Sequence, residues 1–190
     1  MEIPYSFTAT GAKESFDKYL LPQAQEELHC LQIGVSTGDA TMYLLQHVLS
    51  NSSSTLTDVD TWRGSGIVEE VGIRWSEVEK QYDSHHQNEI AIGRLIKCKE
   101  STNAFFDRNT QIFDFIYVDG NLSGPELLQY GMSAIRCLAP QGLLAINDSA
   151  WRQKNSPTPG PSPAVSALID VYSDQVSVLE ANNLVWMRRN

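Results

Sequence analysis

Residues 31–40 read Leu-Gln-Ile-Gly-Val-Ser-Thr-Gly-Asp-Ala, and this stretch decides the fold. An apolar run over 28–33 predicts a buried strand, and a helical pattern follows over 39–49. The turn between them carries two glycines, Gly34 and Gly38, which let the backbone adopt positive φ and approach a ligand closely. It is neither a Gly-x-Gly-x-x-Gly dinucleotide site nor a phosphate loop with Lys and Ser or Thr. Alone, the turn is equally compatible with a tight strand–helix connection that binds nothing.

Strand-like runs alternate with helical patterns on both sides of this turn. Such alternation is typical of an α/β protein, and it predicts a Rossmann-like fold with a mostly parallel sheet and helices on both faces. Two runs around Asn182-Asn183 predict a closing C-terminal antiparallel hairpin at one edge. The predicted strands are 28–33, 56–59, 95–99, 113–118 and 143–146, the hairpin pairs 176–179 with 184–187, and the helices are 39–49, 75–82, one from Gly124 and 164–172.

The length of 190 residues predicts a single domain, 1–190. Two segments interrupt its regular pattern. The connection 63–94 is longer than most and contains the aromatic Trp75 and Tyr82, so we expect a lid or substrate insertion there. The segment 152–163 is rich in proline, which cannot donate a hydrogen bond to a helix or sheet, and we expect an extended loop. His85 and His86 lie in the first segment, where an exposed helix end explains them better than a catalytic role.

Charge and composition exclude some partners. The formal net charge of −9 would repel the phosphates of duplex nucleic acid, which is therefore disfavoured as a partner. No apolar run approaches the roughly 18 residues that a membrane helix needs, so no membrane partner is expected. The first residues, 1–5, lack the basic start and apolar stretch of a signal peptide, and we expect a cytoplasmic protein. Cys30, Cys98 and Cys137 form no Cys-x-x-Cys pair, which indicates buried, reduced thiols.

Asp60 follows the predicted strand 56–59, about 20 residues after the glycine turn. An acidic side chain at this place can accept hydrogen bonds from both hydroxyls of an adenosine ribose. Trp62 would then lie beside the nucleoside. The simpler alternative is that Asp60 only caps the segment that follows, and the glycine turn upstream favours the ribose role.

Two further carboxylates follow neighbouring predicted strands, since Asp119 comes after 113–118 and Asp148 after 143–146. In parallel sheets ligands bind beyond the carboxyl ends of the strands. Oxygen ligands at two such ends could share a hard divalent cation such as Mg²⁺. The alternative is that Asp119 hydrogen-bonds the cofactor or the glycine loop and that Asp148 caps a turn.

The motifs Leu-Gln-Ile-Gly-x-x-x-Gly, Asp-Thr-Trp, Phe-Asp-x-Ile-Tyr-Val-Asp-Gly and Gly-Leu-Leu-Ala-Ile-Asn-Asp occur in this order between Gln32 and Trp151. This combination resembles the class I S-adenosylmethionine-dependent methyltransferases. It is most similar to methyltransferase family 24, akin to small-molecule and sugar O-methyltransferases. The resemblance implies that S-adenosyl-L-methionine is the cofactor and that Asp119 lies near the reacting methyl group. The cofactor-binding residues that we expect are Gln32, Gly34, Ser36, Gly38, Asp60, Trp62, Ser101 and Asp119.

Three positions depart from the pattern of this family. Gln32 replaces a common acidic residue, Leu122 stands where the family often has histidine, and Asn147 precedes Asp148 in place of an Asp-Asp or Asp-Asn pair. The last change weakens the case for a metal at Asp119 and Asp148. We keep these two residues as the candidate catalytic pair.

The expected reaction is methyl transfer to a hydroxyl of a small molecule or a sugar. Hydroxyl acceptors need a base or a metal that helps to remove the proton. The alternatives are a nucleic-acid or protein methyltransferase and a non-catalytic S-adenosylmethionine-binding module. A homo-oligomer is left open by the sequence.

Overall fold

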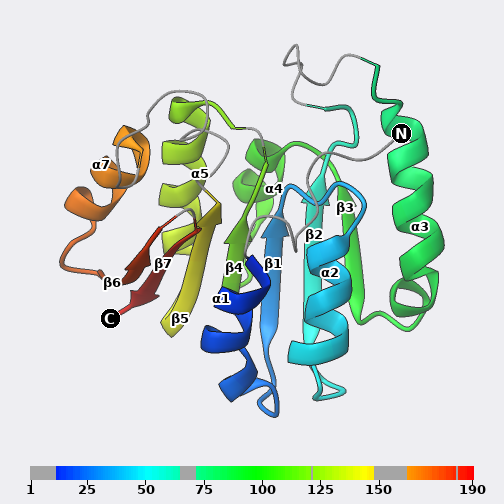
Figure 1. The fold of residues 1–190 in the computed structure, drawn as a ribbon, viewed down its shortest axis with the longest axis horizontal. Helices are drawn as coiled ribbons and strands as arrows, with labels where there is room; N and C mark the ends of the chain where they lie inside the picture. The colour runs from blue at the N-terminus through cyan, green and yellow to red at the C-terminus, as the bar shows by residue number, and fades with distance from the viewer. Residues whose placement is uncertain (1–11, 65–71, 121, 148–161, 183) are drawn as a thin grey trace.

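The computed structural model describes residues 12–64, 72–120, 122–147, 162–182 and 184–190. These residues form one seven-stranded sheet in the order β3-β2-β1-β4-β5-β7-β6 (Figure 1). The strands β1 to β5 pair in parallel, and β7 pairs antiparallel with both β5 and β6. The strands are β1 (His29–Ile33), β2 (Thr55–Asp60), β3 (Leu95–Lys99), β4 (Phe113–Val118), β5 (Leu138–Asn147), β6 (Val176–Ala181) and β7 (Leu184–Arg189).

The strand order reverses between β1 and β4, because β2 and β3 extend the sheet to one side of β1 and β4 and β5 extend it to the other. The carboxyl ends of these strands therefore lie on either side of the reversal point, which is where ligands bind in open α/β sheets. The predicted Rossmann-like fold is confirmed, including the C-terminal antiparallel hairpin. None of the helices among the described residues is long and apolar enough to cross a membrane.

Helices cover both faces of the sheet because strand side chains alternate between them. Side chains such as Cys30, Leu56 and Phe115 point to the face that packs against the first helices of the chain. Leu31, Val59 and Ile116 point to the opposite face. The first face is covered by α1 (Ala12–Tyr19), α2 (Asp39–Tyr43) and α3 (Trp75–Ala91), and the second by α4 (Thr102–Arg108), α5 (Gly124–Arg136) and α7 (Pro163–Val171) (Figure 1).

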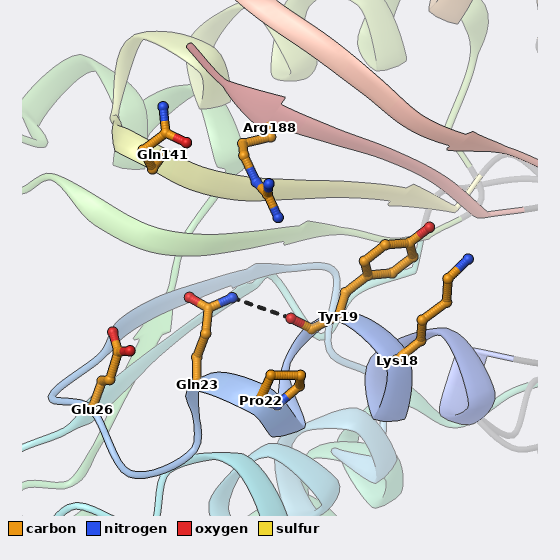
Figure 2. Close-up of a pocket in the computed structure, with 7 residues that line it drawn as sticks. All are labelled: Lys18, Tyr19, Pro22, Gln23, Glu26, Gln141 and Arg188. Atoms are coloured by element: carbon orange, nitrogen blue, oxygen red, sulfur yellow. Dashed lines mark hydrogen bonds between the residues drawn. The ribbon is translucent and has the colours of Figure 1, made fainter.

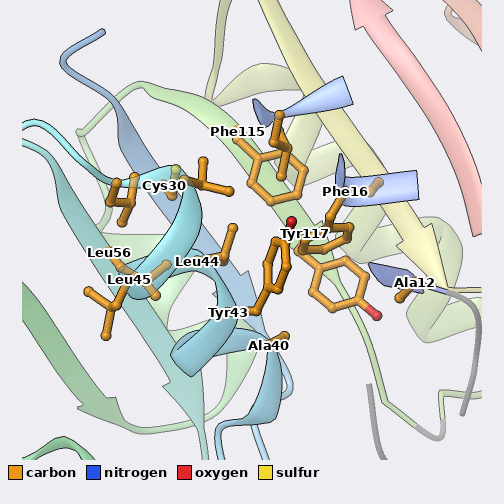
Figure 3. Packing of buried hydrophobic residues seen from close by; sticks show 14 of the residues in the cluster. Ala12, Phe16, Cys30, Ala40, Tyr43, Leu44, Leu45, Leu56, Phe115 and Tyr117 are labelled. Carbon is orange, nitrogen blue, oxygen red and sulfur yellow. The ribbon is translucent and has the colours of Figure 1, made fainter. Parts of the chain in front are cut away.

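Phe16 of α1 is the centre of the core on the first face and is fully buried (Figure 3). Its ring makes edge-to-face contacts with Tyr43, Phe115, Tyr117 and Trp186 at centroid distances of 5.1–5.9 Å. Each such pair contributes about 0.5–1.5 kcal/mol beyond the area that it buries. Sequence analysis predicted no helix here, yet α1 joins α2 to the two strands β4 and β7.

Several elements differ from their predicted extents. The helix predicted over 39–49 is α2 followed by a π-helical turn, η2 (Leu44–Val48). β5 begins at Leu138, before the predicted start at residue 143, because Gln141 takes a left-handed φ of 64° and the pairing with β4 shifts register there. A bulge of this kind absorbs turn-forming residues without ending the strand. The short helix α4 was not predicted.

The two unusual segments are described only in part. In 63–94, α3 extends well past the predicted 75–82, and 65–71 lie outside the described residues, so the lid stays a prediction. In 152–163, Ser162 and Pro163 already form the start of α7, where the Ser162 hydroxyl accepts a hydrogen bond from the amide of Val165. The other residues of that segment lie outside the description. All three cysteines are free, but only Cys30 is buried as predicted. The prediction was wrong for Cys98 and Cys137, which are half-buried because they lie on the edge strand β3 and at the end of α5.

Candidate cofactor site

The glycine turn needs glycine at both of its positions. Gly34 has a φ of +79°, and a Cβ there would lie 2.1 Å from the carbonyl oxygen of Asp119. Gly38 has a φ of +85°, and a Cβ there would lie 2.4 Å from Nε2 of His86. The first glycine thus lets β1 approach β4, and the second lets α3 approach the start of α2. Ser36 between them is also left-handed, with a φ of 55°.

Asp60 is bound to the main chain of this turn. Its Oδ2 accepts hydrogen bonds from the amides of Val35, at 2.7 Å, and Ser36, at 3.1 Å. Its Oδ1 accepts one from the amide of Trp62, at 2.7 Å. A carboxylate offers about four acceptor positions, so about one remains for a ligand. Asp60 therefore organises the glycine turn and remains partly exposed at the end of β2.

Trp62 closes over the other side of the turn. Its indole Nε1 donates a hydrogen bond to the carbonyl oxygen of Ser36, at 2.9 Å, and its own φ is left-handed, at 48°. The ring lies 4.9 Å from the ring of Tyr82, and the Lys97 ammonium lies 4.7 Å from its centre. Only 3% of Trp62 is exposed. In this conformation the indole packs against α3 and β3, and its contact with a nucleoside stays a prediction.

A buried polar layer lies one step below the strand ends, on the face covered by the first helices. Asp58 pairs in register with Gln32 on one side and with Lys97 on the other. The Oδ2 of Asp58 accepts hydrogen bonds from Thr41 of α2, at 2.7 Å, and Tyr82 of α3, at 2.8 Å. Its Oδ1 has no partner, and burial raises the pKa of this carboxyl to about 7. This layer joins α2 and α3 to β2 directly beneath the turn.

Gln32 belongs to the same layer and is 2% exposed. Its Nε2 donates a hydrogen bond to the carbonyl oxygen of Gly34, at 3.1 Å, and its Oε1 accepts one from Thr41, at 3.3 Å. The side chain that replaces the family's acidic residue thus supports the turn from below. Its direct contact with cofactor stays a prediction.

Asp119, at the end of β4, is held by three donors. Its Oδ1 accepts hydrogen bonds from the amide of Gly120, at 2.7 Å, and from Nδ2 of Asn147, at 2.9 Å. Its Oδ2 accepts one from the Tyr117 hydroxyl, at 2.9 Å. Burial raises the pKa of Asp119, and the three hydrogen bonds oppose this effect because they stabilise the charged form. The Asn147 side chain also hydrogen-bonds Tyr117, so the three side chains form a closed network.

The remaining predicted residues are not all brought to this place. Ser101 is exposed, and its hydroxyl caps α4 by accepting a hydrogen bond from the amide of Ala104, at 3.2 Å. Asp148 lies outside the described residues, so neither its catalytic nor its metal role is tested. Within the described residues, no group of three His, Cys, Asp or Glu side chains is placed to hold a metal ion. His85 is exposed as expected, whereas His86 is 2% exposed and packs on Gly38.

Sequence analysis missed Tyr117, Asp58 and Tyr82. A signal for the first two was present, because side chains two residues apart on a strand share a face. Tyr117 therefore lies beneath Asp119, and Asp58 lies beneath Asp60. The contact of Tyr82 with Asp58 depends on the packing of α3, for which the sequence carries no comparable signal.

A separate hollow of about 360 Å³ lies away from these strand ends (Figure 2). It opens between the end of α1 with the segment that follows it and the strands β5 and β7, which carry Gln141 and Arg188. Its lining shares no residue with the predicted cofactor site. The residues that line it are Lys18, Tyr19, Pro22, Gln23, Glu26, Gln141 and Arg188.

Known proteins share the sequence pattern of this site. Residues 31–149 match the model of methyltransferase family 24, which is described as a methyltransferase domain. The chain belongs to this methyltransferase family. The predicted S-adenosylmethionine-dependent methyltransferase is thereby confirmed at the level of family. No curated protein matches the chain closely enough to count as a relative.

Solved structures of several methyltransferases share the fold of this one. A putative rRNA-methylase from Clostridium thermocellum has a TM-score of 0.66 at 13% identity, over 100% of this chain and 98% of that one. A putative O-methyltransferase from Klebsiella pneumoniae also has a TM-score of 0.66 at 13% identity, over 96% and 86%. An O-methyltransferase from Bacillus cereus, solved in complex with SAH, has a TM-score of 0.60 at 14% identity, over 99% and 93%. One of these names refers to rRNA and two refer to methylation of oxygen, and the likeness at this level of identity extends to the fold alone.

Proposed function

We propose that this methyltransferase transfers the methyl group of S-adenosylmethionine to a hydroxyl of a small molecule or a sugar unit. The observation that carries the proposal is the position of two carboxylates, Asp60 and Asp119, on either side of Gly34 at the strand-order reversal. One carboxylate organises the turn that would hold the cofactor. The other lies where an acceptor would meet it.

The residues around the turn fit the proposed cofactor. Gly34 and Gly38 pack closely against Asp119 and His86, so the main chain between them, residues 35–37, would contact the cofactor. Asp60 keeps about one acceptor position free for a ribose hydroxyl. Ser36 would contact the methionine or ribose part, and Ser101 would lie near the adenine. When bound, S-adenosylmethionine would supply a methyl group that its sulfonium already activates.

The protein must then remove a proton from the acceptor hydroxyl, and Asp119 is the proposed proton acceptor. Its Oδ2 accepts one hydrogen bond, from Tyr117, which leaves one position for the proton of an acceptor. Burial raises the pKa of Asp119, and a higher pKa makes a carboxylate a stronger base near neutral pH. Tyr117 and Asn147 fix the direction in which this carboxylate faces. Asp148 remains a second candidate for the catalytic pair.

The acceptor class rests on the family resemblance and on charge. The net charge of −9 disfavours a nucleic-acid acceptor, since phosphates would be repelled. Transfer of labelled methyl from S-adenosylmethionine to panels of phenols, sugars, total RNA and proteins distinguishes the acceptors. Labelling of RNA or protein alone would contradict the proposal.

Calorimetry of S-adenosylmethionine and S-adenosylhomocysteine binding tests the cofactor site. We expect wild type to bind both nucleosides and Asp60→Ala to bind them about tenfold more weakly or worse, because hydrogen bonds to a charged group are lost. Asp60→Asn keeps the shape and separates charge from packing. Asp107→Ala, an exposed carboxylate on α4, is the matched control and should bind like wild type. A folded wild type that binds neither nucleoside would overturn the proposal.

A further inference from the structure

Asn147 is the side chain that faces Asp119 across the ends of β4 and β5. Its Nδ2 lies 2.9 Å from Oδ1 of Asp119, and the amide of Gly120 lies 2.7 Å from the same oxygen. Both acceptor positions of Oδ1 are thus used by N–H donors. Among the described residues, the N–H groups of Gly120 and Asn147 therefore occupy the positions at Oδ1 where a cation would have to bind.

Among the residues that the structure describes, the donor set around Asp119 does not fit a divalent metal ion. Mg²⁺ and Ca²⁺ require six or more oxygen ligands, of which carboxylates are the strongest that a protein supplies. Among the described residues, only one position at Oδ2 of Asp119 remains unused, and Tyr117 lies against that oxygen as a donor. A metal with more than one bond to Asp119 would have to displace Asn147 or Tyr117 from its hydrogen bond to this carboxylate.

We propose that Asn147 takes the place of a divalent cation beside Asp119, so that this methyltransferase works with a metal-free carboxylate. The proposal rests on the proposed function in that Asp119 is the proton acceptor. Asn147 is a positioning residue, because it acts on the acceptor only through Asp119. Its N–H stabilises the charged carboxylate and fixes its orientation, as a cation would, without adding a full charge to the crevice.

The Asn147→Asp variant tests this substitution of amide for metal. Two carboxylates at hydrogen-bonding distance cannot both ionise unless a proton or cation lies between them. We expect 10 mM Mg²⁺ or Ca²⁺, compared with EDTA, to raise the Tm of the variant by about 4 °C or more. The same change should move the Tm of wild type by less than about 1 °C. Asn103→Asp, an exposed amide on α4, should behave like wild type, and Asn147→Asp with Asp119→Asn should lose the response.

A second measurement needs no variant. Mn²⁺ titrated into wild type should remain free, as read from the electron paramagnetic resonance signal of the hexaaqua ion. Binding of Mn²⁺ to wild type that is lost in Asp119→Asn would overturn the proposal. A folded Asn147→Asp variant whose Tm does not respond to Mg²⁺ or Ca²⁺ would also overturn it. These outcomes are separate from the cofactor site, because loss of S-adenosylmethionine binding in wild type contradicts the proposed function whatever the cation does.

Discussion

Asp60 and Asp119 occupy equivalent places on β2 and β4, yet they are held in different ways. Asp60 accepts its three hydrogen bonds from main-chain amides, those of Val35, Ser36 and Trp62. Asp119 accepts one from a main-chain amide and two from side chains, Tyr117 and Asn147. One carboxylate belongs to the framework of the turn, and the other belongs to a side-chain network.

Because of this difference, side-chain substitutions can change the proton affinity of Asp119 more readily than the orientation of Asp60. A side-chain substitution removes a donor from Asp119 without moving the chain, so its proton affinity can change by single mutations. The donors of Asp60 are present whatever side chains the turn carries, so its orientation depends on the backbone conformation. A binding function suits the fixed carboxylate, and a proton-transfer function suits the adjustable one.

Gly34 lies between Asp60 and Asp119, where the end of β1 contacts the end of β4. We expect Gly34→Ala to have the largest effect, because it would disturb both carboxylates. The new Cβ would stand 2.1 Å from the carbonyl oxygen of Asp119, and the backbone is left-handed. Overpacking and the left-handed conformation together should lower the free energy of unfolding by roughly 4 kcal/mol. Chemical denaturation measures it. Gly93→Ala, also left-handed but with no atom near its Cβ, should lose only about 1 kcal/mol, and equal losses would contradict the steric account.

Asp58→Asn tests the buried carboxyl on β2, two residues before Asp60. Burial raises the pKa of Asp58 from 3.8 to about 7, so the folded state favours the protonated form. The stability that Asp58 contributes is complete below pH 4 and is lost as pH rises through 7. The asparagine variant does not titrate, and its stability relative to wild type should rise by roughly 3 kcal/mol between pH 4 and 8. Denaturation curves across this range check it, and parallel pH profiles of the two proteins would refute the buried titration.

Tyr117→Phe sharpens the comparison at β4, with the smallest expected effect. The ring stays buried against Phe16, but Asp119 loses a donor to its charged form. The pKa of Asp119, already raised by burial, should rise by about one further unit. The ¹³C carboxyl resonance of Asp119 measures this, and the acid limb of the activity profile should move to higher pH. Tyr130→Phe, on the opposite face, should leave both unchanged. An unshifted Asp119 resonance in the first variant would argue against the network.

The sheet could be predicted because its strands are short apolar runs that end in polar residues. β1, β2, β3 and β4 were predicted to within one residue at each end. β1, β2 and β4 are buried between two layers of helices, and the edge strand β3 is still a short apolar and polar run with clear ends. β5 and α2 were harder. A bulge at Gln141 and a π-helical turn after Tyr43 are responses to packing that leave no periodic pattern in the sequence.

The site could be predicted as a set of strand ends but not as a set of contacts. Asp60 and Asp119 were found because they follow strands. The hydrogen bonds from main-chain amides to Asp60 depend on the left-handed conformations of Ser36 and Trp62. Neither serine nor tryptophan is a residue type that indicates a left-handed backbone. Asn147 was noticed as a departure from the family, and only the distance to Asp119 shows what it does there.

His86 fills the volume that Gly38 leaves empty, although the two residues come from different helical segments. The side chains allowed at positions 38 and 86 therefore depend on each other, because both would occupy the same volume. A lineage that replaced Gly38 by asparagine, which tolerates left-handed backbone better than most residues, would have to shrink residue 86 as well. Related sequences should record this as covariation between the two positions, with histidine at 86 confined to chains that keep glycine at 38.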